Sequence, residues 1–353
     1  MNKQQNHLHI ESSLPNIAFI VGMGRSGTTL LTSMLNMNPE IISTPENEFI
    51  LFSYNPYVFK NFNNPNVVKS FINIFNYNFN NVITIWKPKS IEKDVINLKI
   101  KSYANMCKLV YLNYPLSQKE KSVVKWVIDK NPGYSLHINK LNNVFPQAKY
   151  IVIVRDFRDN IVSRKKYSEN FASIYSLAAA WNYFYFKIYK SIHKNNLSFH
   201  LVRYEDLVNF PKESLQEICN YLGVTFTDEM LRFQDFSKDL KAHAKENISD
   251  EKFKKISSMH SNLDNEVNSN RVEAYLDELS SSDISILDNV CSFYANKFNY
   301  SILENKNNKI SYYKKFTYKL AYAQIVIFNF FKTMYYNVPS SLRIIFKQKS
   351  NKS

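Results

Sequence analysis

The chain has 353 residues, and its 45 Lys and Arg outnumber its 30 Asp and Glu, for a formal net charge of +15 at pH 7. Hydrophobic residues make up 45% of it, which is enough for a large core and excludes a wholly disordered chain. The three cysteines have neither metal-ligand nor disulfide-framework spacing. The charge predicts anionic partners, and nucleic acid, anionic lipid and phosphorylated small molecules are the open classes.

Segment 1–15 is a polar leader without the apolar stretch of a secretory signal, so a cytoplasmic location is the default expectation. No uncharged apolar run approaches the roughly 20 residues that a membrane-spanning helix needs. The longest such run, 320–331, lies between Lys319 and Lys332.

Short apolar segments alternate with helical patterns over residues 16–225, and each segment ends in polar, mostly charged residues. Strands are expected at 17–21, 123–128, 150–154 and 198–202. A helix is expected at 211–222, ending at Gly223. This alternation predicts an α/β fold with a P-loop-type, doubly wound parallel sheet flanked by helices. In such sheets ligands bind at the carboxyl ends of the strands.

Residues 45–122 separate the first two expected strands and far exceed an ordinary βα connection. They predict a mostly helical insert after the first βα unit, which adds either core or the acceptor-side wall of a cleft. The main domain is expected to span 16–304, followed by a basic aromatic tail at 305–353.

Glycine is concentrated in one turn, because three of the five glycines are at positions 22, 24 and 27, directly after the first expected strand. Such a turn points backbone N–H groups at one place, and the following helix N-terminus adds partial positive charge, so the pair can bind an anion. Arg25 adds a full cation. The spacing imitates the P-loop, but Thr28 stands in the place of its lysine, which disfavours a kinase or NTPase.

A second candidate anion site follows the third expected strand. Arg155 at the strand end and Ser163 on the next helix can hold a phosphate between a guanidinium and a hydroxyl. The alternative is a structural network in which Arg155 or Arg158 pairs with Asp156 or Asp159.

Four motifs, in this order and spacing, resemble those of the sulfotransferases that use 3′-phosphoadenosine 5′-phosphosulfate (PAPS). They are Gly-Met-Gly-Arg-Ser-Gly-Thr-Thr-Leu-Leu, Asp-Lys-Asn-Pro, Tyr-Ile-Val-Ile-Val-Arg-Asp-x-Arg-Asp-x-x-x-Ser and Arg-Tyr-Glu-Asp-Leu. The resemblance covers residues 16–300 and is closer to the bacterial and tyrosylprotein-sulfotransferase branch than to the cytosolic steroid and phenol enzymes. It implies transfer of a sulfuryl group from PAPS to an acceptor hydroxyl, without a metal ion.

The resemblance also implies roles for particular residues. The 5′-phosphosulfate loop corresponds to Arg25, Ser26, Gly27, Thr28 and Thr29, in which Arg25 contacts the phosphosulfate and the backbone amides hold the 5′-phosphate.

The 3′-phosphate pair corresponds to Arg155 and Ser163, and Tyr204 corresponds to an aromatic residue that lies against the cofactor. Arg271 falls where relatives have a basic segment near the 3′-nucleotide, although the glycine and tryptophan of that segment are missing here.

For catalysis, the resemblance assigns Lys130 to the charge that develops on the bridging oxygen. Glu46 aligns with the glutamate that acts as general base in the tyrosylprotein branch, and Glu48 is its competitor. The hydroxyl acceptor is expected to be a carbohydrate first, then a peptidyl tyrosine or a lipid headgroup.

From residue 310 the chain becomes basic and aromatic. Segment 310–335 either lies on a membrane surface or forms a helix that packs on the catalytic domain or on a second subunit of a homodimer. A catalytically degenerate basic protein that binds nucleic acid or membrane is the remaining rival. It leaves the glycine turn and the strand-end arginines unexplained, so no nucleic-acid partner is expected.

Overall fold

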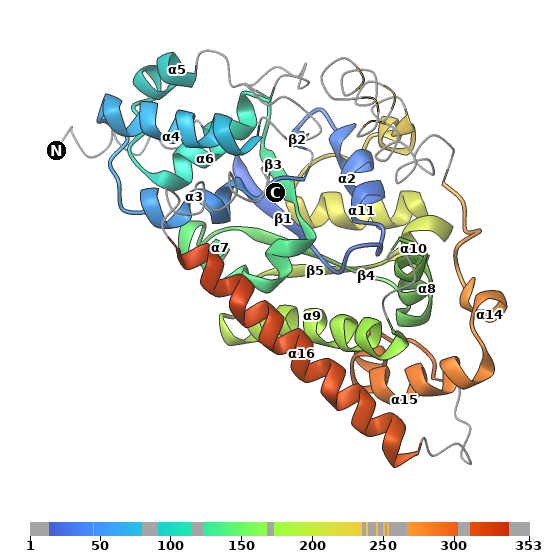
Figure 1. The fold of residues 1–353 in the computed structure, drawn as a ribbon. Coiled ribbons are helices and arrows are strands. Elements are labelled where there is room, and N and C mark those ends of the chain that lie inside the picture. Colours follow the sequence, from blue (N-terminus) through green and yellow to red (C-terminus); the bar gives the residue numbers. More distant parts are fainter. Residues whose placement is uncertain are drawn as a thin grey trace.

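The computed structural model describes residues 14–44, 46–79, 91–114, 123–167, 173–234, 267–302 and 311–338, and the single positions 238, 245, 250 and 253. The expected polar leader lies almost wholly outside the described residues. Within them, a sheet is covered by helices on both faces, and one long helix runs along an outer edge of the molecule (Figure 1).

The strands and helices have the following bounds. The strands are β1 (Asn16–Val21), β2 (Ile41–Ser43), β3 (Trp126–Lys130), β4 (Lys149–Val154) and β5 (Phe199–Arg203). The helices before β4 are α2 (Thr28–Asn36), α3 (Phe49–Tyr57), α4 (Pro65–Phe79), α5 (Ile91–Asn97), α6 (Tyr103–Leu112), the 3₁₀ helix η1 (Pro132–Leu136) and α7 (Ile138–Val144). Those after β4 are α8 (Phe157–Tyr167), α9 (Ile174–Lys194), α10 (Tyr204–Asn209), α11 (Pro211–Leu222), the 3₁₀ helix η2 (Asp228–Leu231), α14 (Tyr275–Glu278), α15 (Ser281–Lys297) and α16 (Tyr312–Asn337).

The sheet has the strand order β2-β3-β1-β4-β5, and every pairing is parallel. Its central strands are almost continuously apolar because helices bury both of their faces. The predicted α/β class with a doubly wound parallel sheet is therefore confirmed. Because all strands run the same way, the carboxyl ends of β1, β3 and β4 meet at one edge of the sheet.

The sequence-based prediction was wrong about two strands. It did not include β2, which has only three residues and is flanked by turn-forming residues. It also began β3 at Val123, whereas pairing with β1 begins at Trp126 and Val123 is exposed. The expected helix at 211–222 is α11, and Gly223 ends it in the left-handed region at φ 77°.

Alternate side chains of β1 enter two separate cores. Ile17, Phe19 and Val21 belong to a large cluster with residues of α6, α7 and α9, whereas Ala18 and Ile20 face a smaller one with residues of α2 and α11. In Figure 1, α9 covers one face of the sheet while α2 and α11 lie on the other. Burial on both faces holds the central strand in one register.

Between β2 and β3 the described residues form four helices, α3 to α6, as the helical insert predicts. Aromatic contacts join α3 to α6 and to α4: the rings of Phe49 and Tyr111 lie 5.1 Å apart, and those of Tyr57 and Phe71 lie 5.2 Å apart. Tyr111 also donates a hydrogen bond to the buried Asp129 of β3. The insert is thus tied to the main sheet next to Lys130.

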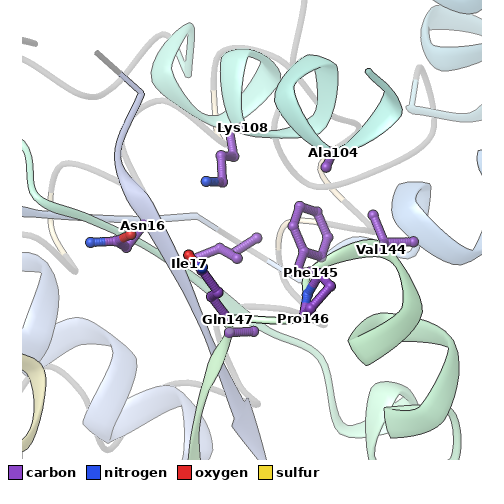
Figure 2. A pocket seen from close by; sticks show the side chains of 9 residues that line it. Asn16, Ile17, Ala104, Lys108, Val144, Phe145, Pro146 and Gln147 are labelled. Carbon is purple, nitrogen blue, oxygen red and sulfur yellow. The ribbon is translucent and has the colours of Figure 1, made fainter. Parts of the chain in front are cut away.

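A pocket of about 230 Å³ lies at the amino-terminal edge of the sheet (Figure 2). Its lining includes Asn16 and Ile17 at the start of β1, Lys108 of α6, and Phe145 and Pro146 before β4. This edge is opposite to the carboxyl ends of the strands, so the pocket is separate from the predicted anion sites.

Candidate functional site

Side chains from two other elements hold the glycine turn after β1. The Gly22 N–H donates to the hydroxyl of Ser135 at 2.9 Å, and that hydroxyl lies 3.1 Å from the Gly22 carbonyl, to which it donates. The Asn160 side-chain amide donates to the Gly24 carbonyl at 3.1 Å and to the Ser26 hydroxyl at 3.0 Å. The turn is therefore fixed from η1 on one side and from α8 on the other.

The turn places the N-terminus of α2 at the edge of the sheet where the carboxyl ends of the strands lie. Arg25 and Gly27 are both in the left-handed region, at φ 71° and 88°. Gly27 is the N-cap residue of α2, no side chain among the described residues caps that helix, and its first turn has no acidic residue. The N–H groups of the first turn and the helix dipole therefore favour an anion at this place.

Arg155 follows β4 and is almost fully buried beside this turn. Its Nη1 donates to the Arg25 carbonyl at 3.2 Å and its Nη2 to the Arg271 carbonyl at 2.6 Å. Its guanidinium lies over the Tyr204 ring, 4.4 Å from the centroid. Among the described residues, its buried Nε has no hydrogen-bond partner. A buried cation held by carbonyls, with a donor left over, has the properties of an anion-binding group.

Arg25 and Ser163 join the two predicted anion sites. The Nε of Arg25 donates to the Ser163 hydroxyl at 3.3 Å, which links the β1 turn to helix α8. Arg155 contacts the backbone of Arg25 from the same side. The structure thus brings two predicted sets of residues together in one site: those expected to bind the 5′-phosphosulfate and those expected to bind the 3′-phosphate.

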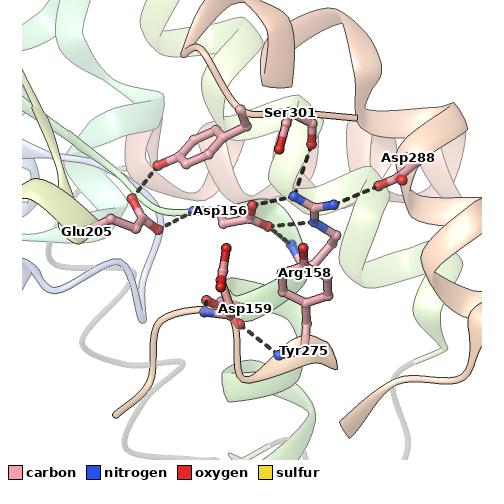
Figure 3. A network of polar contacts seen from close by, with 9 residues as sticks. Asp156, Arg158, Asp159, Glu205, Tyr275, Asp288 and Ser301 are labelled. Carbon is pink, nitrogen blue, oxygen red and sulfur yellow. Dashed lines mark hydrogen bonds and ion pairs between the residues drawn. The ribbon is translucent and has the colours of Figure 1, made fainter. Parts of the chain in front are cut away.

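Arg158 has the structural role that the sequence left open for either arginine. It is 2% exposed, its Nη2 pairs with Asp156 at 2.7 Å, and its Nη1 pairs with Asp288 of α15 at 3.4 Å (Figure 3). These pairs connect the end of β4 to the C-terminal helices. Of Arg155 and Arg158, it is Arg155 that contacts the glycine turn.

Two buried carboxylates fix the segments that carry Arg155 and Arg271. Glu205 accepts the Asp156 N–H at 2.9 Å and the Tyr300 hydroxyl at 2.8 Å, and burial raises its pKa. Asp159 accepts the N–H groups of Glu273 and Tyr275 at 2.8 and 2.9 Å, and burial raises its pKa to about 6 (Figure 3).

Arg271 contacts the site through its backbone, whereas the family resemblance predicted a basic side chain near the 3′-nucleotide. Its carbonyl accepts from Arg155, but its own Nη1 pairs with Glu278 at 2.8 Å. Its guanidinium is therefore engaged by α14, and its direct contribution in this structure is the backbone oxygen.

Lys130 and Glu46 form an ion pair at the end of β3. Lys130 is 3% exposed and also donates to the Thr29 hydroxyl at 3.1 Å, whereas the Glu46 side chain is 48% exposed. Glu48 is the N-cap residue of α3 and lies near Gly133. Of the two candidate bases, Glu46 forms the ion pair with Lys130 and has the more exposed side chain.

Sequence reasoning missed Ser135, Asn160 and Glu205 as residues that shape the site. Each acts on a backbone group far away in the chain, and no local pattern reports such a contact. Their positions in the first helices after β3, β4 and β5 are a usable signal, because ligand sites in such sheets lie at the carboxyl ends of strands.

Two features are absent from the described part of the chain. No group of three or more His, Cys, Asp or Glu could hold a metal ion there. Within the same residues, no helix combines the length and the apolar character needed to cross a membrane.

A parallel α/β sheet with an anion-binding turn and a strand-end arginine is what the resemblance to the sulfotransferases predicts. The model of the sulfotransferase family matches residues 16–228, more than half of the chain, and the chain belongs to that family. It is accordingly a transferase. The sulfotransferase domain from the curacin biosynthetic pathway has a similar fold: it is 20% identical, the match covers 82% of this chain and 99% of that domain, and the TM-score is 0.52.

Two nematode proteins are similar in sequence, and both are named putative protein-tyrosine sulfotransferases. The one from Caenorhabditis elegans is 25% identical over 182 residues, which are 50% of this chain and 66% of that protein. The one from Caenorhabditis briggsae is 21% identical over 291 residues, which are 80% of this chain and 88% of that protein. These nematode relatives bear out the likeness to the tyrosylprotein branch and give no support for the bacterial part of that resemblance.

Proposed function

We propose that this protein transfers the sulfuryl group of PAPS to an acceptor hydroxyl. One observation carries the proposal: Arg25, Arg155 and Ser163 converge with the N-terminus of α2 at one edge of the sheet. The site thereby offers two separate groups of anion-binding residues, as a nucleotide with both a 5′ and a 3′ charged group requires.

The residues present fit this donor. When bound, PAPS supplies an activated sulfuryl group at its 5′ end. The backbone N–H groups of Gly27 to Thr29 and the Arg25 side chain would hold the 5′ end, because they combine the helix dipole with a full cation. Arg155 and Ser163 would hold the 3′-phosphate, and the Nε of Arg155, which has no partner within the described part of the chain, gives that guanidinium a further donor.

Lys130 and Glu46 are proposed to act on the two sides of the transferred sulfuryl group, Glu46 on the acceptor hydroxyl and Lys130 on the donor. Sulfuryl transfer resembles phosphoryl transfer in needing mainly alignment and charge stabilisation. Glu46 would accept the proton of the acceptor hydroxyl, for which its exposure and its carboxylate suit it. Lys130 would stabilise the negative charge that develops on the leaving oxygen, next to Thr29. In the structure the ion pair keeps these two side chains at the same place.

The names of the nematode relatives favour a peptidyl tyrosine over the carbohydrate that the sequence favoured, so tyrosine is the acceptor to test first. The +15 net charge also suits an acidic polypeptide around that tyrosine. Carbohydrate and lipid headgroups are the next acceptors to test.

The test measures transfer of labelled sulfate from PAPS to acidic tyrosine peptides, and to sulfatable oligosaccharides in parallel. Glu46→Gln should lower kcat by 10²-fold or more at unchanged donor affinity, which is the usual effect of losing a general base. Glu48→Gln is the matched control and should stay within about threefold of the wild type. Equal rates for Glu46→Gln and the wild type would remove Glu46 as the base, and no transfer to any hydroxyl class would refute the proposed function.

A further inference from the structure

One face of α16 packs on the protein. Tyr318, Ala321, Ile325 and Asn329 recur at helical spacing; Ala321 and Asn329 are buried, and Tyr318 and Ile325 pack against the main core. The Tyr318 hydroxyl accepts a hydrogen bond from the side-chain amide of Asn182 in α9, at 2.7 Å. Of the two sequence interpretations of this segment, packing on the catalytic domain therefore holds for this face.

The opposite face of α16 is apolar and exposed. We call it the exposed stripe; it consists of Tyr313, Phe316, Leu320, Ile327, Phe331 and Met334. These positions lie within about 60° of one another around the helix, at roughly 100° per residue. Each is 48% or more exposed, and Tyr313 is the most exposed at 75%. Figure 1 shows α16 along the outer edge of the molecule, beyond α9. A contiguous apolar surface of this kind marks an interaction site.

The charged residues of the chain segment that carries the stripe all have the same sign. Residues 305–353 contain ten Lys or Arg and no Asp or Glu. Lys315 and Lys319 are exposed beside the stripe on α16. At the far end of the helix Lys140 donates to the Asn337 side chain at 2.8 Å, which adds a cation there.

We propose that α16 docks the protein on an anionic membrane surface, with the exposed stripe in the headgroup layer and the lysines at the lipid phosphates. A helix of 26 residues with an apolar face flanked by lysines is suited to lie in that interface. It does not meet the requirements for spanning the bilayer. The anionic surface attracts each nearby lysine by about 1 kcal/mol. The apolar side chains of the exposed stripe insert into the headgroup layer.

A second copy of the chain is the weaker occupant. A two-fold interface brings the same patch of each subunit together, so Lys315 and Lys319 would meet a partner helix that has no acidic residue to pair with them. The described helix has lysines but no carboxylate, and only an anionic partner complements that pattern.

The test is co-sedimentation of the full chain with vesicles of phosphatidylcholine alone or with 30% phosphatidylglycerol. The wild type should bind the anionic vesicles at least tenfold more tightly, and less tightly as salt rises. Ile327→Gln/Phe331→Gln should weaken that binding tenfold or more. Lys315→Gln/Lys319→Gln should weaken it by about fivefold per lysine removed. The matched control is Ile96→Gln/Phe210→Gln, which changes two exposed apolar side chains on other elements and should bind as the wild type does.

Melting curves establish that each variant is folded, and sedimentation equilibrium without lipid reports the oligomeric state. Equal binding to neutral and anionic vesicles, or unchanged binding of the stripe variant, would overturn the proposal. A dimer that the stripe variant dissociates, in a chain that binds no vesicle, would assign the stripe to a second copy instead. None of these readouts requires sulfuryl transfer, so the outcome is independent of the proposed function.

Discussion

Gly27 tests whether the geometry of the anion-binding turn is required for the site. It adopts φ 88° and ψ 10°, a conformation in which an L-residue costs roughly 1–2 kcal/mol. A Cβ at this position would also lie 2.5 Å from Cδ2 of Tyr204, which is closer than real Cβ contacts come. Gly27→Ala should therefore displace the Tyr204 ring.

The displacement should reach Arg155, because the guanidinium lies over that ring. Loss of a partly buried cation–π contact costs about 0.5–2 kcal/mol. Together with the backbone strain, Gly27→Ala should destabilise the fold by about 2–3 kcal/mol and lower the affinity for 3′-phosphoadenosine 5′-phosphate (PAP) by tenfold or more.

The assay combines urea unfolding with PAP titration, and Gly24→Ala is the control in the same turn. Gly24 is outside the left-handed region, and a Cβ there would meet nothing within 4 Å among the described residues. Its replacement should leave PAP affinity unchanged and stability within about 1 kcal/mol of the wild type. Equal behaviour of the two variants would refute the reasoning about this turn.

Two further predictions concern buried carboxylates. Burial raises the pKa of Asp129 to about 7 in the folded protein, compared with about 3.9 in the unfolded chain. The protonated side chain therefore stabilises the fold fully below about pH 3.9, and this contribution is lost as the pH rises through about 7. Urea unfolding measures the free energy of unfolding of the wild type and of Asp129→Asn from pH 4 to pH 8. The wild type should lose a few kcal/mol relative to the variant over this range, whereas a constant difference would show that the pKa is not raised. Asp159→Ala should leave the N–H groups of Glu273 and Tyr275 unpaired and weaken PAP binding several-fold while AMP binding stays unchanged, as measured by titration calorimetry; equal losses for both nucleotides would count against a role at the 3′-phosphate.

The fold class and the position of the site could be predicted because both depend on local patterns. Buried parallel strands are visible as apolar runs, and three of the five glycines of this chain fall in one turn. In the structure Arg25, Arg155 and Ser163 meet as their strand-end positions predict, since all strands share one direction.

The remaining features depend on contacts between distant segments. Nothing local distinguishes Arg158, which binds Asp288 130 residues away, from Arg155, which faces the turn. The engagement of Arg271 by Glu278 could not be read from the family pattern either, because the segment departs from it. The exposed face of α16 was likewise undetermined until the position of α9 was known.

The most direct test of a PAPS site is the thermal stability of the chain with PAP, AMP or ATP. PAP at ~100 times its dissociation constant should add about 2.7 kcal/mol and raise the melting temperature by several degrees. AMP, which lacks the 3′-phosphate, should have a much smaller effect, and Arg155→Ala should abolish the difference between the two. Equal shifts with PAP and AMP, or a shift with ATP and none with PAP, would contradict the assignment.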